Sequence, residues 1–215
     1  MGVDLITYGK HTIDFKSKTY LELATEIKAK LDKIEITNLK YIKHALLDFY
    51  RDKEWLDGIT DHIKKLHEWH FEEEDYRWTE DKYITLYGPH NLELEFDEYK
   101  IYFWDPPYRY NYWFHWIEKL HRDEWRKYFY QIITGFGGNR AIYLPDNMTE
   151  SSKYAQECDD WTFEEIENGL IKDYGIFEKP LHEIKEEDDC WYYIDYFKDI
   201  DWSKNAPIDE FLPKP

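Results

Sequence analysis

Three groups of histidine, carboxylate and arginine side chains could perform chemistry, and the first has a spacing that suits a metal ion. His67, His70 and Glu74 stand at positions i, i+3 and i+7, which places them on one face of a helix. Three such ligands could hold zinc and leave one position open. The run from His67 to His70 is not the HExxH arrangement of zinc proteases, because its second histidine comes one residue early. Histidines on a solvated acidic face are commoner, so we expect no metal or other cofactor and regard these three as weak candidates.

The second group is His115, Glu118 and His121, which are spaced by three residues on a predicted helix. Its outer members lie about 120° apart around the helix axis, which is wide for a shared metal ion. Glu118 can instead pair with Arg122 at i, i+4, a spacing that stabilises a helix without any catalytic role. The alternative interpretation makes His115 or Glu118 a general base.

The third group surrounds a predicted buried strand over residues 140–144. Asp146 directly follows this strand, at the position where open sheets often bind ligands, and Arg140 begins it. A small enzyme, a hydrolase or a metal-dependent one, could therefore have a pocket formed by His115, Glu118, Arg140 and Asp146. The plainer interpretation is that Asp146 makes a turn or caps the next helix.

Other catalytic patterns are missing from the sequence, and the cysteines do not supply one. There is no GxSxG motif and no kinase signature. Cys158 and Cys190 stand among acids, which should raise the pKa of a thiol and make it a poor nucleophile. A count of two cysteines, with no signal peptide and no long apolar run, favours a soluble protein of the reducing cytoplasm. We therefore lean toward a protein that is not an enzyme.

The charge of the chain favours a basic partner. The formal net charge is -18, with 15 acids against 7 bases in residues 51–100 and 18 against 7 in residues 151–215. Direct binding of nucleic acid needs clustered Lys and Arg, so this charge disfavours it. Acidic runs interleaved with tryptophan combine ionic attraction with a residue type that is common in interface hot spots. The plain alternative is a well-solvated surface.

The sequence therefore predicts an acidic, aromatic-rich binding protein, of the immunity or inhibitor type that neutralises a basic protein such as a toxin. The alternatives are the small enzyme above, a DNA mimic and a scaffold protein. The residues predicted to bind the partner are Glu72, Glu73, Glu74, Asp75, Trp78, Asp159, Asp160, Trp161, Glu186, Glu187, Asp188, Asp189 and Trp191.

The helices and strands expected from the sequence, which must position these residues, indicate one α+β domain over residues 1–215. A hairpin is expected over residues 3–15, with its turn at Gly9 and Lys10. Capping boxes that begin at Thr19 and Thr162 predict helices, and a meander of three strands is expected over residues 83–104. Further helices are expected over residues 38–51, 59–71, 110–121, 123–135, 151–158 and 180–187, and a further strand over residues 191–197.

The sheet is expected to be mixed or mostly antiparallel and to pack with about five to seven helices. The tail from about residue 199 should be irregular. The stretch Tyr102–Trp116, with nine aromatic residues among its fifteen, should form the core between sheet and helices. Trp104, Trp113 and Trp116 should then be mostly enclosed.

Overall fold

A computed structural model describes residues 3–34, 84–87, 92–104, 110, 112–146, 149–158 and 160–205. The helices expected over residues 38–51 and 59–71 lie outside these ranges. So do the candidate metal ligands His67, His70 and Glu74 and the acidic run Glu72–Asp75 with Trp78.

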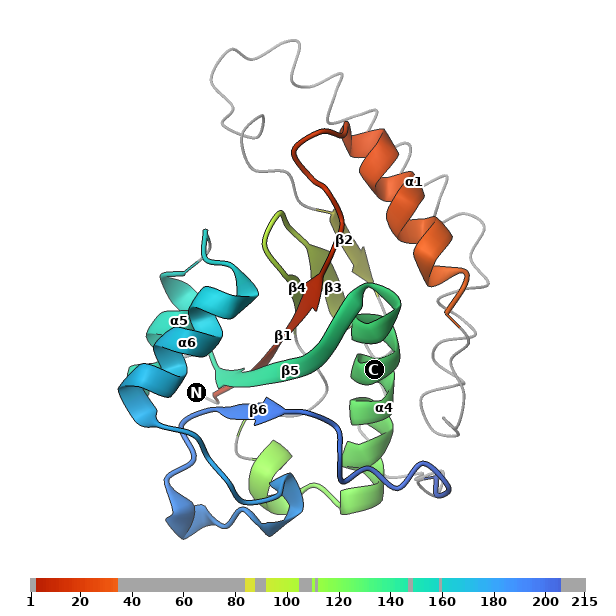
Figure 1. Ribbon diagram of the computed structural model, residues 1–215. Helices are drawn as coiled ribbons and strands as arrows, with labels where there is room; N and C mark the ends of the chain where they lie inside the picture. Colours follow the sequence, from red (N-terminus) through yellow and green to blue (C-terminus); the bar gives the residue numbers. More distant parts are fainter. Residues whose placement is uncertain are drawn as a thin grey trace.

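The fold is α+β and is organised around one sheet of six strands, in the order β2-β3-β4-β1-β5-β6 (Figure 1). Every pairing between neighbouring strands is antiparallel, as the sequence predicted for most of the sheet. The predicted meander is confirmed as β2, β3 and β4. The strands are β1 Leu5–His11, β2 Ile84–Tyr87, β3 Glu93–Phe96, β4 Ile101–Trp104, β5 Gly137–Pro145 and β6 Tyr193–Asp195.

The predicted N-terminal hairpin is wrong. Residues 5–11 form one continuous strand that lies between β4 and β5, and Gly9 pairs with Ile101 on one side and Ala141 on the other. A Cβ atom at Gly9 would lie 2.5 Å from Cγ1 of Ile133. The glycine is therefore needed for the close approach of a helix to the strand. Glycine is also common in turns, and for that reason the sequence predicts a turn at this position.

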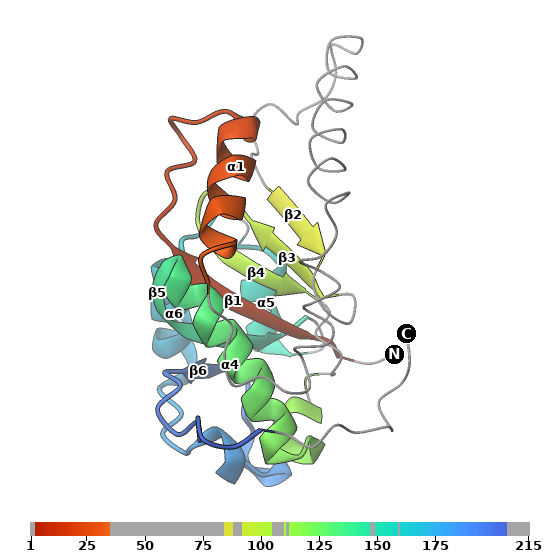
Figure 2. The ribbon, with the colours of Figure 1, turned by 90° about the vertical axis from the view of Figure 1, so that its right-hand side faces the viewer.

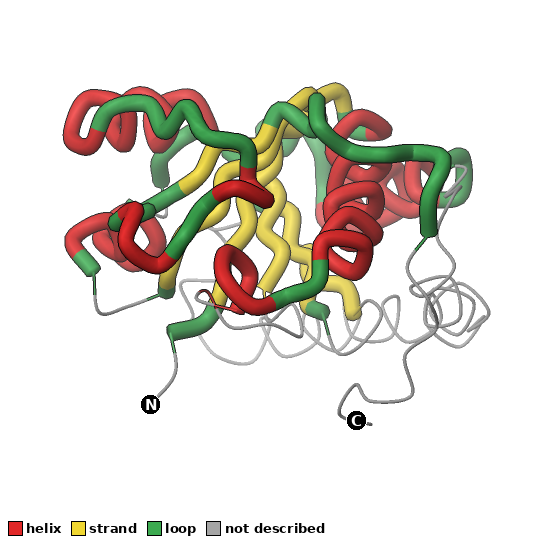
Figure 3. The backbone as a smooth tube through the Cα atoms, turned by 90° about the horizontal axis from the view of Figure 1, so that it is seen from below, coloured by secondary structure: helices red, strands yellow, loops and turns green. Residues whose placement is uncertain are grey.

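Helices cover both faces of the sheet. The helix α1, Tyr20–Leu31, and the helix α4, Lys119–Gly135, lie on one face, while α5, Lys153–Gln156, and α6, Phe163–Tyr174, lie on the other. Figure 2 looks onto the α1 and α4 side, and Figure 3 shows from below that the strands lie between the two groups of helices. No helix of the described residues is long and apolar enough to cross a membrane.

Two of these helices begin where the sequence predicts. The side chain of Thr19 accepts a hydrogen bond from the backbone N–H of Glu22, and the Glu22 carboxylate accepts the N–H of Thr19 in return. Thr162 and Glu165 form the same reciprocal pair at the start of α6. Both capping boxes are therefore confirmed, since each satisfies backbone groups that the first helical turn leaves unpaired.

The predicted helices over residues 110–121 and 123–135 are arranged differently. A π-helix, Tyr112–Trp116, precedes α4, and Asp123 lies inside α4 instead of capping it. Its carboxylate accepts hydrogen bonds from Arg126 at 2.9 Å and from Lys119 at 2.9 Å. Asp123 is thus a buried partner of arginine, a role that local sequence cannot distinguish from helix capping.

Arg126 joins α4 to the end of the sheet through buried ion pairs. Its guanidinium donates to both carboxylate oxygens of Asp195, at 2.6 and 2.8 Å, and also to Asp123 and Asp199. Tyr143 donates a further hydrogen bond to Asp195 at 2.9 Å. The network fixes β6 and the segment that follows it against α4.

The C-terminal part is mostly irregular, as expected from residue 199 to residue 205. The helix predicted over residues 180–187 is replaced by two short 3-10 turns, and the helix predicted over residues 151–158 is a 3-10 turn followed by α5. The strand predicted over residues 191–197 is confirmed in shorter form as β6. The 3-10 turns are Glu150–Ser152, Leu181–Glu183 and Glu186–Asp188.

The aromatic stretch Tyr102–Trp116 contributes to the core, with one exception. Phe103 and Trp113 are fully buried, and the Trp113 ring lies 5.2 Å from the ring of Tyr143. Trp104 is half-buried, whereas 56% of Trp116 is exposed. The predicted enclosure is therefore wrong for Trp116, which ends the π-helix at the surface.

Candidate functional site

The structure does not gather the four residues of the predicted enzyme pocket around a common point. Arg140 points toward α6, where it donates to Glu167 at 2.6 Å and lies over the ring of Phe163. Glu118 lies at the start of α4, on the opposite face of the sheet, and its carboxylate bonds to His121 at 3.0 Å.

The other two pocket candidates also have separate surroundings. His115 lies on the π-helix before α4, where its ring contacts the neighbouring rings of Phe114 and Trp116. Asp146 follows β5 and accepts the backbone N–H of Asp4 at 2.8 Å, which fits the turn role given above as the plainer interpretation. This arrangement offers no shared position for a substrate to all four side chains.

Metal ligands do not cluster in the described part of the chain. Within it, no group of three or more His, Cys, Asp or Glu side chains is arranged to hold a metal ion. His67, His70 and Glu74 lie outside that part and stay a prediction.

The two cysteines are free thiols. Burial raises the pKa of Cys190 to about 12, and the charge of Asp188 adds a smaller rise. The predicted direction of the shift is confirmed for Cys190, but its main cause is burial, whereas the sequence had pointed to the neighbouring acids.

The predicted partner-binding residues of the C-terminal third are mostly at the surface. Trp161 and Trp191 are 41% and 42% exposed. Asp188 is half-buried, because it pairs with Lys179 and caps the backbone N–H of Lys185 at 2.8 Å. Asp159 lies outside the described ranges, and the remaining exposed members are Asp160, Glu186, Glu187 and Asp189.

Trp161 and Trp191 are both attached to the short segment Glu150–Gln156. Ser151 donates a hydrogen bond of 2.5 Å to the backbone carbonyl of Trp191, and the Tyr154 ring lies edge-on at 5.8 Å from the ring of Trp161. The two attachment points, Ser151 and Tyr154, are three positions apart in the chain, a helical rise of roughly 5 Å. We call the surface around this segment and the end of α6 that contacts it the α5 face; its exposed residues are Glu150, Lys153, Gln156, Glu157, Asp160, Trp161, Asp173 and Trp191.

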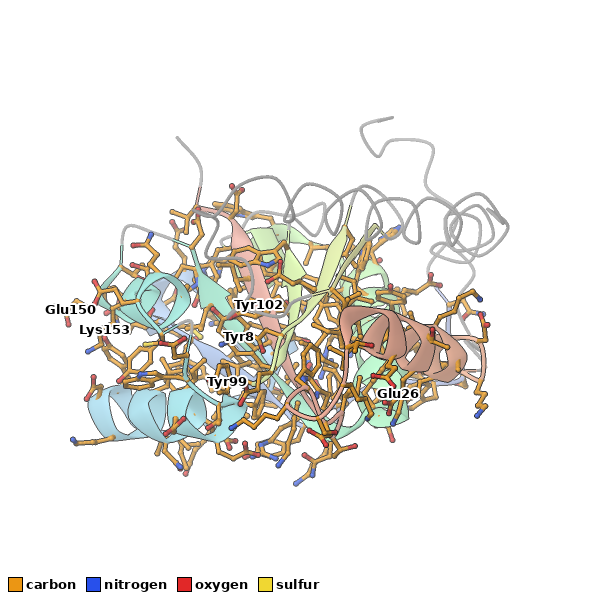
Figure 4. The ribbon with its side chains drawn as sticks, turned by 90° about the horizontal axis from the view of Figure 1, so that it is seen from above. Tyr8, Glu26, Tyr99, Tyr102, Glu150 and Lys153 are labelled. Atoms are coloured by element: carbon orange, nitrogen blue, oxygen red, sulfur yellow. The ribbon has the colours of Figure 1, made fainter. Side chains whose placement is uncertain are left out.

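A buried lysine positions one end of the α5 face. Lys100 is fully buried, and its ammonium donates to the backbone carbonyls of Trp161 at 3.0 Å and Cys158 at 3.4 Å. The ammonium also lies 4.7 Å from the ring centre of Tyr102. Tyr8 and Tyr102 are buried, and Figure 4 shows them inside the molecule, whereas Glu150 and Lys153 lie at its outer edge.

The centre of the α5 face is a cluster of two tyrosines, one carboxylate and one lysine. Asp173, near the end of α6, accepts hydrogen bonds from Lys153 at 2.6 Å and from the Tyr154 hydroxyl at 2.9 Å. The Lys153 ammonium lies 5.0 Å from the ring centre of Tyr154 and 5.9 Å from that of Tyr174. A Cβ atom at Gly169 would lie 2.6 Å from the Tyr154 ring, so the glycine lets this ring lie against α6.

The ionisation of the cluster follows from these contacts. The hydrogen bonds from Lys153 and Tyr154 lower the pKa of Asp173, and the bond to Asp173 raises the pKa of Lys153. Burial, followed by the bond to Asp173, raises the pKa of Tyr154 to about 12. At neutral pH the cluster therefore holds one ammonium and one carboxylate between neutral phenols.

Sequence reasoning missed most of this centre. Tyr154, Asp173 and Tyr174 belong to two helices that the sequence predicts separately, and nothing in the spacing indicates that they meet. The capping box at Thr162 and the terminating Gly175 determine the two ends of α6, and so place Asp173 in its last turn. The missing information was how α6 lies across α5, which depends on Gly169.

Comparison of the chain with protein-family models, with curated proteins and with solved structures gives no match.

Proposed function

We propose that the protein binds a basic protein partner through the α5 face. The observation that carries the proposal is the pair of exposed tryptophans, Trp161 and Trp191, attached to one short helical segment with carboxylates around it. Tryptophan is enriched among the residues that dominate binding energy at protein interfaces. Carboxylates around such anchors speed association with a basic protein and disfavour acidic ones.

The size and charge of the surface suit such an interface. A standard interface buries about 800 Å² on each partner, and both tryptophans are attached to the same short segment, at Ser151 and Tyr154. Glu150, Glu157 and Asp160 are exposed there. Glu186, Glu187 and Asp189 precede Trp191 in the chain and are exposed as well.

The biological role that fits best is that of an immunity or inhibitor protein, which neutralises a basic toxin by covering its surface. An acidic surface repels the phosphate groups of nucleic acid, so the partner that we propose for an immunity or inhibitor protein is itself a protein. We place the action in the cytoplasm, because two free thiols suit a reducing compartment.

Capture of partners from cells of the source organism at low salt tests this proposal. The wild-type protein should retain a basic protein that is released as the salt concentration rises, because exposed charges are screened by salt. A double variant, Trp161→Ala with Trp191→Ala, should lose it by at least about tenfold, the loss expected for hot-spot residues.

Trp116→Ala is the matched control, since Trp116 is 56% exposed, more than either tryptophan of the pair, and belongs to the π-helix instead of α5. It should retain the partner as the wild type does. Equal retention by the double variant, or retention of acidic proteins alone, would contradict the proposal. If the double variant binds normally and Glu186→Gln with Glu187→Gln does not, the interface lies at the acidic run of residues 186–189 instead.

A further inference from the structure

We propose that Asp173, Tyr154 and Tyr174 form a cation-binding subsite at the centre of the α5 face, which Lys153 occupies in the free protein and a partner's guanidinium group takes over. This inference rests on the function proposed above. It specifies the chemistry of one contact with the partner. It also makes Lys153 an internal competitor that occupies the subsite until the partner binds.

The geometry around Lys153 is that of a recognition site for a cation. One carboxylate oxygen receives the ammonium at 2.6 Å, and two tyrosine rings stand 5.0 and 5.9 Å from the nitrogen. A carboxylate with aromatic faces is the usual way in which proteins bind ammonium and guanidinium groups. Lys153 therefore stands in for a ligand of the same chemistry.

The site is built by more than one helix and is held in shape without Lys153. Tyr154 is only 4% exposed, and its hydroxyl bonds to Asp173 at 2.9 Å. The ring of Tyr174 is supported by the ring of Tyr192 at 6.2 Å. Removal of the lysine side chain should therefore leave the two rings and the carboxylate in place.

Lys153 can be displaced at low cost. Its side chain is 46% exposed, and that of Asp173 is 32% exposed, so their ion pair is largely screened by water. Exposed pairs of this kind contribute little to stability. A partner that brings its own cation replaces the lost contacts and releases the lysine into solvent.

A guanidinium group fits the site better than an ammonium. Both hydrogen bonds to Asp173 end on Oδ2, and within the described part of the chain Oδ1 accepts none. A planar guanidinium can bind both oxygens at once and stack on a tyrosine face, whereas an ammonium acts as a point charge. The proposed occupant is therefore an arginine of the basic partner.

Titration of an arginine-rich hexapeptide by calorimetry tests the subsite. The variant Lys153→Met should bind it roughly two- to fivefold more tightly than the wild type, because the internal competitor is gone. Lys172→Met is the matched control: Lys172 is also exposed and adjoins Asp173 in the chain, but its ammonium does not lie over the tyrosine rings. The gain in peptide affinity from Lys172→Met should be smaller than that from Lys153→Met. Adding Tyr174→Leu to Lys153→Met should abolish the difference in affinity between the two lysine variants.

A second measurement does not depend on a protein partner. Agmatine, which carries a guanidinium group, should shift the Tyr174 ring signals in NMR spectra of Lys153→Met at lower concentration than in the wild type or Lys172→Met. Equal shifts in all three proteins, or equal gains for both lysine variants with the peptide, would overturn the subsite. If the tryptophan double variant still loses the partner in that case, the proposed function stands and the subsite alone is wrong.

Discussion

Replacement of Arg126 by methionine should destabilise the fold more than any other single loss of charge described above. The guanidinium lies between three aspartates, and Asp123 and Asp195 are 1% and 2% exposed. Methionine preserves much of the length and apolar packing of the side chain, but it leaves these carboxylates buried without their cation. Breaking a buried ion pair by removing one partner costs about 3–5 kcal/mol.

This loss is large compared with the total stability of a domain, about 5–15 kcal/mol. For a chain of this size it corresponds to a fall in the melting temperature of about 6–20 °C. Tyr143 and the backbone N–H of Phe197 still donate to Asp195 in the variant, so the lower part of the range is expected.

Chemical denaturation at pH 7, followed by tryptophan fluorescence, measures the change in the free energy of unfolding. Lys10→Met is the control, because Lys10 and its partner Glu164 are 39% and 40% exposed, and such surface pairs contribute about 0–1 kcal/mol. If Arg126→Met and Lys10→Met prove equally stable, the network does not hold β6 against α4.

The same variant has a characteristic dependence on pH. Burial alone would raise the pKa of Asp199, but the hydrogen bond and charge of Arg126 outweigh it and bring the pKa down to about 2. A carboxylate with a depressed pKa stabilises the fold above its unfolded pKa and loses that contribution as the pH falls. The wild type should therefore lose this stability between about pH 4 and 2, and Arg126→Met should lose less over the same interval.

Three further predictions concern single side chains. Burial lowers the pKa of His11, so stability should fall as the pH drops below about 6.5, and His11→Asn should show a flatter profile in denaturation curves. Gly169→Ala would normally stabilise a helix by about 1 kcal/mol, but contact with Tyr154 should reverse the sign and change Trp161 fluorescence. Cys190 should react with a thiol reagent at pH 8 far more slowly in the folded than in the unfolded protein; equal rates would contradict its burial.

Local signals in the sequence predicted the elements whose boundaries depend on local bonds. The two capping boxes place the starts of α1 and α6 because each box forms within four residues. The alternation of Leu92, Leu94 and Phe96 with acids predicts a strand with one buried face, and all three apolar side chains are fully buried in the structure.

The errors arose where distant residues determine a position. Gly9 lies in a central strand because Ile133 packs on it. Asp123 is buried within α4 beside Arg126, whose other partners, Asp195 and Asp199, come from the far end of the chain. The tryptophans of the candidate site were identified from composition and are exposed as expected. Tyr154, Asp173 and Tyr174 could not be identified as a cluster, because the contact between Tyr154 of α5 and the two residues of α6 depends on the packing of α6 on α5.

The most direct test of the central claim is the hydrogen-exchange footprint of the captured partner on this protein. The proposed function predicts protection of backbone amides in residues 150–161 and around Trp191, with little change in the π-helix that carries Trp116. Protection centred on Tyr112–Trp116, with unchanged exchange over α5, would show that the partner does not bind the α5 face and would contradict the proposal.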